Sequence, residues 1–139
     1  MAPPVRISGA GVDLSPRVFR TGTVVASPSA STETIIASLT IAGDPALQAG
    51  VLLFAFAAYT VGASGVSVNL KLRQTDTSGS TLRATGATTI AAASLGAHEL
   101  QAWDASPTLP NQIYVLTMTV ASGAATSTVS AVELVAIVI

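Results

Sequence analysis

The sequence predicts an all-β protein, a jelly-roll-like antiparallel β-sandwich with an extended N-terminal arm. Three observations support this fold class. Apolar and polar residues alternate with a period of two in several segments, turns rich in Gly, Pro and Ser separate about eight such segments, and no stretch shows a convincing helical period. An ordinary Greek-key sandwich remains the alternative, because sequence alone does not separate the two connectivities.

Length and composition indicate one domain that associates with other proteins. The 139 residues suit an arm at 1–31 and a sandwich domain at 32–139. Only 9% of the residues are charged, against about 25% in an ordinary soluble domain. Such a surface has little electrostatic repulsion against self-association, so we expect an oligomer. The net charge of −1 offers no basic footprint for nucleic acid, and the lack of cysteine excludes disulfides and thiolate chemistry.

The first 31 residues predict an arm that binds a partner. Four prolines fix φ and remove hydrogen-bond donors, so we expect an extended chain with at most an edge strand near residues 17–25. Three arginines make the first twenty residues net positive, whereas the rest of the chain is net negative. The residues expected to contact the partner are the basic and the spaced apolar ones: Arg6, Ile7, Arg17, Val18, Phe19, Arg20 and Val24.

Strands are expected throughout residues 32–139. Residues 33–42 alternate, so that Ile35, Ala37, Leu39 and Ile41 share one face. Residues 50–61 and the end of 126–139 are apolar on both faces, which indicates cover by a second sheet or by a neighbouring subunit. Residues 66–73 form the cleanest amphipathic strand and direct Lys71 and Arg73 to water or a partner. The remaining strands are expected at 81–83, 88–92, 99–104 and 112–120.

The segment Thr75-Asp-Thr-Ser-Gly-Ser predicts a hairpin turn. Asp and Ser side chains cap local backbone groups, so Asp76 is expected to act as a cap. Gly79 is expected to adopt a positive φ.

No membrane span and no export signal are expected. The charge-free stretch at 46–70 holds a continuous apolar part shorter than the roughly 20 residues that a spanning helix needs, and strand-like alternation follows it. The N-terminus lacks a continuous apolar h-region, which favours synthesis in a cytosol.

The sequence offers no constellation for catalysis, cofactors or metals. His98 and Glu99 are adjacent, but neighbouring strand residues point to opposite faces, and a general base needs an oriented partner. The acids are scattered without a Ca²⁺-ligand pattern, and the glycines at 9 and 11 lack the strand and helix of a phosphate loop. We therefore expect a non-enzyme without a small-molecule substrate.

Trp103 has two interpretations. Burial in the core is favoured, because large aromatic residues are rare in this chain. The alternative is an exposed anchor or sugar platform, for which a glycan-binding site would show an exposed cluster around Trp103, Tyr59 or Tyr114.

Five stretches resemble the jelly-roll domains of tailed-bacteriophage virion proteins in strand rhythm and composition over residues 31–139. They are Thr32-Glu-Thr-Ile-Ile-Ala-Ser-Leu-Thr-Ile, the Gly-led apolar strand at 50–61, Val66-Ser-Val-Asn-Leu-Lys-Leu, Thr117-Met-Thr-Val and Val132-Glu-Leu-Val-Ala-Ile-Val-Ile. A small chain with an N-terminal arm and no fibre-like shaft looks most like a head decoration, or cement, protein. The resemblance implies a homotrimer that binds the major capsid protein on the capsid exterior and stabilises the shell, and it implies no catalytic residues.

Two other functions remain open on the sequence. One is a tail-fibre-type module that binds a receptor or carbohydrate, and the other is a small outer-membrane or secreted adhesive domain.

Overall fold

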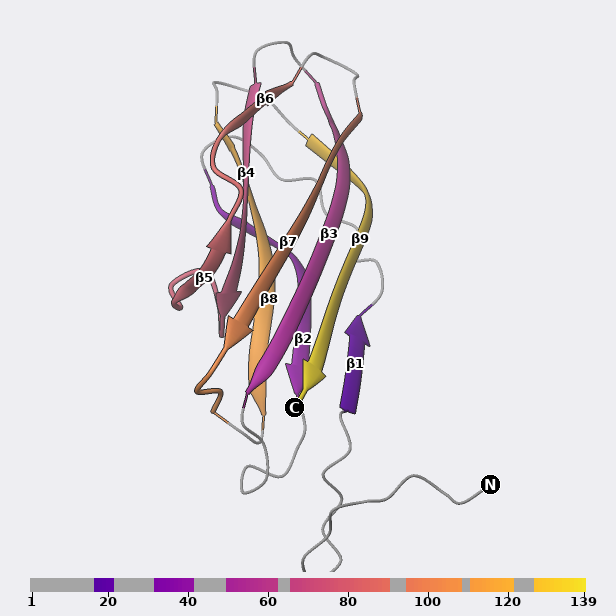
Figure 1. The fold of residues 1–139 in the computed structure, drawn as a ribbon. Coiled ribbons are helices and arrows are strands. Elements are labelled where there is room, and N and C mark those ends of the chain that lie inside the picture. The colour runs from indigo at the N-terminus through magenta and orange to yellow at the C-terminus, as the bar shows by residue number, and fades with distance from the viewer. Residues whose placement is uncertain are drawn as a thin grey trace, which may run out of the picture.

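The described part of the chain consists of strands and their connections. The computed structural model describes residues 17–21, 32–41, 50–62, 66–90, 95–108, 111–121 and 127–139. Within these residues no helix is long and apolar enough to cross a membrane. The strands (Figure 1) are β1 Arg17–Thr21, β2 Thr34–Ile41, β3 Val51–Val61, β4 Val66–Gln74, β5 Thr81–Ala84, β6 Thr88–Ile90, β7 Leu95–Asp104, β8 Gln112–Ala121 and β9 Ser127–Val138.

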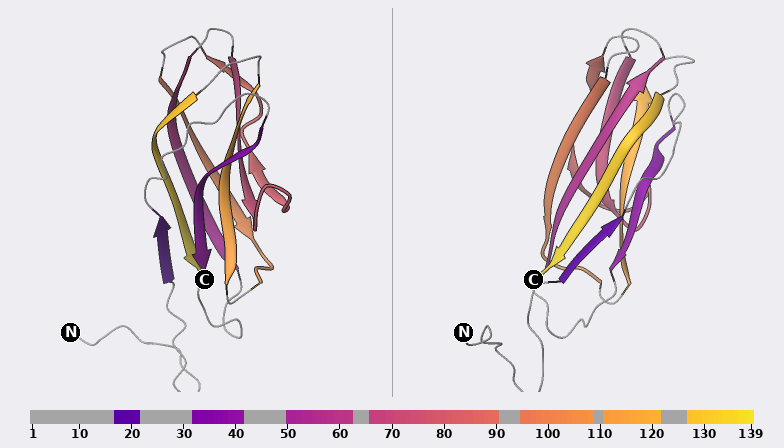
Figure 2. Two further views of the ribbon diagram at one scale, coloured as in Figure 1. Left: turned by 180° about the vertical axis from the view of Figure 1, so that it is seen from behind. Right: turned by 90° about the vertical axis from the view of Figure 1, so that its right-hand side faces the viewer.

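The strands form two antiparallel sheets that pack face to face, as the views in Figure 2 show. The first sheet has the order β1-β9-β3-β7, and the second has the order β2-β8-β4-β5, with β6 paired to β4. The chain alternates between the sheets from β1 to β4 and again from β7 to β9. This is the connectivity of a jelly roll, so the predicted fold class is confirmed.

The core lies between the sheets and follows the predicted alternation. Leu53 of β3, Leu70 of β4, Leu116 of β8 and Leu134 of β9 are all fully buried. Leu70 comes from a strand, β4, whose inward residues are apolar at every second position, as a half-buried strand requires. The outward residues Leu52, Phe54 and Phe56 of β3 are apolar as well, and they are half-buried. Strand β3 is therefore apolar on both sides, as predicted.

Two strand predictions need correction. Strand β2 shifts register between Ile35 and Ala37, which turns Ile35 outward and buries Ile36 and Ala37. A β-bulge places two residues opposite one and so breaks the strict alternation that the sequence suggested. Strand β7 begins at Leu95, four residues earlier than expected, because β3 is long enough to pair with it as far as Thr60.

The β4–β5 hairpin is confirmed, but its glycine serves another purpose. Asp76 Oδ1 accepts hydrogen bonds from the backbone N–H of Ser78 and Gly79, which is the predicted cap. Gly79 does not have the positive φ that we expected, which instead falls on Thr75, at 69°. A Cβ on Gly79 would collide with the carbonyl oxygen of Gln74. The turn therefore needs glycine for space.

A buried polar group joins the sheets near the end of β7. Asp104 accepts a hydrogen bond from the Tyr114 hydroxyl at 2.8 Å and one from Gln74 Nε2 at 2.6 Å. Burial and the adjacent carboxylate both raise the pKa of Tyr114, so this hydroxyl stays protonated and remains a donor. The bonds tie β7 of the first sheet to β8 and β4 of the second.

Part of the expected arm belongs to the sandwich. Residues 17–21 form the edge strand β1, which pairs antiparallel with β9 from Arg17 opposite Val138 to Thr21 opposite Leu134. This is the edge strand expected near residues 17–25, and it covers the backbone edge of β9, which would otherwise be unpaired. Residues 1–16 and 22–31 lie outside the described residues, and the boundary near residue 31 stays a prediction.

Candidate functional site

The outward side chains of the first sheet form an apolar surface, which we call the apolar face. Strand register arranges them in rows across the sheet. One row contains Val18, Ile137, Leu52 and Trp103. The next contains Arg20, Val135, Phe54 and Gln101, and a third contains Glu133, Phe56 and Glu99. The face is therefore apolar from edge to edge near the C-terminal end of β9 and becomes acidic two rows away.

Trp103 is exposed on this face, which corrects the prediction that it fills the core. Its side chain lies on the outward side of β7 and is 49% exposed. The indole packs across Gly50, where an added Cβ would lie only 2.5 Å from Trp103 Cζ2. Val18, at the opposite edge of the same row, is 62% exposed. The two ends of this apolar row are therefore exposed, while Leu52 and Ile137 between them are half-buried.

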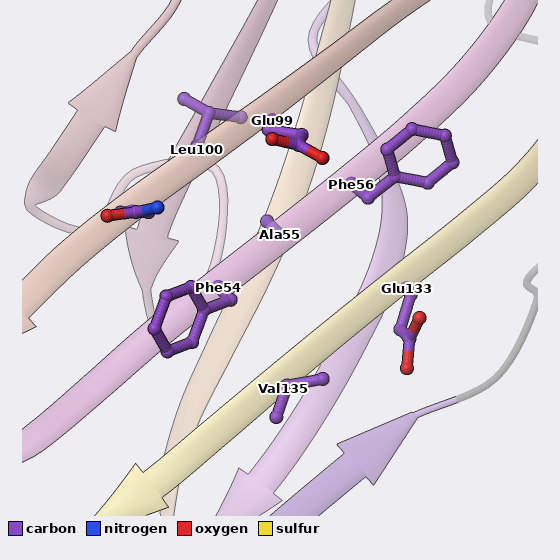
Figure 3. Close-up of a pocket in the computed structure, with 8 residues that line it drawn as sticks. Phe54, Ala55, Phe56, Glu99, Leu100, Glu133 and Val135 are labelled. Atoms are coloured by element: carbon purple, nitrogen blue, oxygen red, sulfur yellow. The ribbon is translucent and has the colours of Figure 1, made fainter.

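A hollow lies in the middle of the apolar face (Figure 3). Phe54 and Phe56 project from β3, Glu99 projects from β7, and Glu133 and Val135 project from β9. Two phenyl rings and two carboxylates thus surround the same depression. Such a site suits a partner that presents both apolar groups and a cation.

The charges of the face lie beside its apolar rows. Arg20 Nε on β1 lies 2.9 Å from Glu133 Oε1 on β9, and both side chains are largely exposed. An exposed pair of this kind contributes about 0–1 kcal/mol to stability. Glu99, on the other edge strand, makes no ion pair with any described residue.

The outward face of the second sheet carries a group of polar side chains that bond to one another around Glu33. Glu33 accepts two hydrogen bonds from Arg73 and one from Thr117 Oγ1, and Lys71 Nζ lies 3.8 Å away. The bonds from Arg73 are the main reason that the pKa of Glu33 lies below its usual value. Lys71 and Arg73 thus face outward as predicted, but their partner is a carboxylate of the same chain. The two faces of the sandwich differ sharply in character.

The predicted arm contacts divide into three groups. Val18 and Arg20 point outward and belong to the apolar face. Phe19 packs against the chain's own core, contrary to the expected partner contact, because it lies on the inward side of β1. Arg17 also points inward, and its buried Nη2 finds no hydrogen-bond partner among the described residues. Arg6, Ile7 and Val24 lie outside the described residues.

His98 and Glu99 point to opposite sides of β7, as predicted. His98 stacks on Tyr59 with ring centroids 5.8 Å apart, whereas Glu99 is exposed on the apolar face. Burial raises the pKa of Tyr59. Among the described residues no three His, Asp or Glu side chains group as metal ligands would.

Sequence reasoning missed Leu52 and Ile137 as members of the site and placed Trp103 inside. The sequence did indicate that β3 and the end of β9 are apolar on both faces. It did not indicate that Leu52 and Ile137 share a row with Val18. That row depends on the pairing of β1 with β9, which no local pattern specifies.

Comparison with solved structures identifies the same fold in a virus-particle protein. The chain is similar to VP2 of infectious bursal disease virus in its subviral particle, with a TM-score of 0.62, 11% identity and coverage of 98% of this chain and 37% of VP2. It is similar to the protein of T=1 particles derived from that virus, with a TM-score of 0.63, 10% identity and coverage of 98% and 36%. It is also similar to the protein of the Gt strain of the virus, with a TM-score of 0.63, 14% identity and coverage of 95% of this chain and 38% of that chain.

The chain spans little more than a third of the length of these solved chains. At such low identity the likeness shows the fold alone. No protein-family model matches the sequence, and no curated protein matches it either.

Proposed function

We propose that this chain is a structural, non-enzymatic protein of a virus particle, and more specifically a trimeric decoration protein on the exterior of a tailed-phage head. The fold supports the first part, because its solved neighbours form virus particles. The strand rhythm and the N-terminal segment support the second. The major capsid protein is the proposed binding partner, and the proposed site of synthesis is the host cytoplasm.

The apolar face is the observation that carries the proposal. A sandwich that acts alone in water needs polar residues on both outward faces. Here the second sheet meets that need with Glu33, Lys71 and Arg73, whereas the first sheet exposes Val18 and Trp103. One side of the sandwich is thus suited to water and the other to a protein surface.

Stabilisation of the shell would follow from mass action. A protein that binds only the assembled shell stabilises it by about 2.7 kcal/mol per site at a hundredfold excess over its dissociation constant. Many sites on one shell multiply this effect. Arg6, Ile7 and Val24 remain the proposed contacts of the N-terminal segment with the capsid.

Carbohydrate binding by a tail-fibre-type module has less support. It called for an exposed cluster around Trp103, Tyr59 or Tyr114, and both tyrosines are fully buried. Trp103 alone remains exposed, and its row neighbours are aliphatic. A sugar platform also needs polar groups around the ring to orient hydroxyls.

Co-sedimentation tests the proposal. The purified chain is mixed with empty heads of the virus that encodes it and, separately, with host cells. Saturable binding to the heads without binding to the cells is the expected result. Binding to cells alone would support the receptor-binding alternative and overturn the decoration proposal.

A further inference from the structure

The apolar face carries opposite charges at its two edges. Arg20 lies on β1 and Glu99 lies on β7, which are the two outer strands of the first sheet. Their rows are adjacent, since Arg20 shares a row with Phe54 and Glu99 shares the next with Phe56. A surface with a cation at one edge and an anion at the other is complementary to a second copy of itself, head to tail.

The apolar row has the same property. Val18 stands at the β1 edge and Trp103 stands at the β7 edge of one row. When the β1 edge of one copy meets the β7 edge of the next, Val18 faces an indole and Arg20 approaches a carboxylate. The apolar contact and the ion pair therefore both form when the β1 edge of one copy lies against the β7 edge of the next.

The width of the sheet suits three copies. Strands lie about 4.8 Å apart, so a four-stranded sheet is about 14 Å wide between its outer strands and about 19 Å wide with their margins. Packed sheets lie about 10 Å apart, so each side-chain layer is about 5 Å deep. A three-sided prism with faces about 5 Å from its axis has sides of about 17 Å, which lies between these two widths of the sheet.

We infer that the apolar face is the trimer interface, with the first sheets of three copies facing a common three-fold axis. Arg20 pairs with the partner subunit's Glu99, and Val18 packs on the partner subunit's Trp103. The residues nearest the axis lie on the two inner strands: Leu52 and Phe54 on β3, and Ile137 and Val135 on β9. This inference rests on the trimer of the proposed function and names its interface.

The inferred contact also accounts for the charges of the third row. Arg20 already holds Glu133 of its own chain, and the partner subunit's Glu99 would approach the same guanidinium from the other side. A guanidinium has five N–H donors and can serve two carboxylates. The face then keeps its acids paired at the edge of the buried apolar rows.

The fluorescence of Trp103 tests the interface, because it is the single tryptophan of the chain. The full chain is diluted across its dissociation range while sedimentation velocity records its mass. We expect the trimer to show blue-shifted emission and protection from acrylamide, and both to be lost on dissociation. A trimer whose Trp103 remains as quenchable as in the dissociated chain would overturn the inference.

A double-mutant cycle tests the ion pair. Arg20→Gln and Glu99→Gln are each expected to weaken trimer association about tenfold, and the double variant is expected to be no weaker than either single one. Arg83→Gln, on β5 of the second sheet, is the matched control and should leave association unchanged. Additive effects, or none, would contradict the pairing, and a dimeric mass would contradict the three-fold arrangement.

The two proposals can fail separately. A trimer that binds heads but ignores changes at Arg20 and Glu99 and does not cover Trp103 refutes the interface and leaves the decoration function standing. A trimer with this interface that does not bind heads refutes the function alone.

Discussion

Arg73 donates two hydrogen bonds to the carboxylate of Glu33 in a bidentate ion pair: Nε lies 2.6 Å from Oε1 and Nη2 lies 3.0 Å from Oε2. The pair joins the residue just before β2 to β4, with β8 lying between these strands in the sheet. Thr117 of β8 donates to the same carboxylate. Three segments of the second sheet are therefore held at one point.

This contact predicts a pH dependence of stability. The pKa of Glu33 is lowered in the fold from 4.5, mainly by the bonds from Arg73. A lowered carboxyl pKa contributes stability that is present above the unfolded pKa and is lost as pH falls through the folded pKa. Glu33→Gln should therefore reduce the free energy of unfolding by about 1–3 kcal/mol at pH 7. Urea titrations should show the difference shrinking below about pH 4.5, whereas a constant difference at all pH values would contradict this role.

The hairpin predicts different outcomes at two glycines. Gly79→Ala should destabilise the chain by more than 1 kcal/mol, because the new Cβ would collide with the Gln74 carbonyl oxygen. Gly86 has a φ of 75° and open space around it. Gly86→Asn should therefore be nearly neutral, since Asn tolerates this conformation. Thermal unfolding of both variants measures the contrast, and equal losses would contradict it.

Neighbouring residues of β3 separate folding from association. Leu53 is fully buried and Phe54 lies on the apolar face. Leu53→Ala should reduce the free energy of unfolding by about 2–5 kcal/mol. Phe54→Gln should keep the circular dichroism of the folded chain but lower its mass in sedimentation velocity. A folded Phe54→Gln variant that associates as the parent chain does would show that this face is not an interface.

The sequence predicted the fold well because its strands are amphipathic and its turns have strong local signals. The alternation in residues 66–73 and the Asp76 turn both reappear in the structure. What failed depends on contacts between distant segments. The bulge after Ile35 follows from pairing with β8, and the exposure of Trp103 follows from its position opposite Leu52. Neither position carries a local signal, because one register step reverses every side chain.

The same limit applied to the site. Strands that are apolar on both faces indicated that a second sheet or a neighbouring subunit covers them. The partner contacts, however, were assigned to the N-terminal arm as a whole. Phe19 packs inward and Val18 outward because β1 pairs with β9 in a fixed register. Only the pairing of β1 turns an apolar segment into one core residue and one surface residue.

Two deletions separate the roles of the N-terminal segment. Removal of residues 1–16 keeps β1 and should leave a folded trimer with much weaker binding to heads, since Arg6 and Ile7 are lost. Removal of residues 1–21 also takes away Phe19 and uncovers the edge of β9, so it should reduce stability and promote aggregation. Undiminished head binding after removal of residues 1–16 would exclude the proposed capsid contact.

The thermal stability of empty heads tests the central claim most directly. Heads are heated with increasing amounts of the full chain, and their opening is followed by light scattering or electron microscopy. The account predicts that the opening temperature rises with protein concentration and levels off when the sites are full, because the chain binds the closed shell in preference to its open products. Heads that bind the chain but open at an unchanged temperature, or heads that do not bind it at all, would contradict the account.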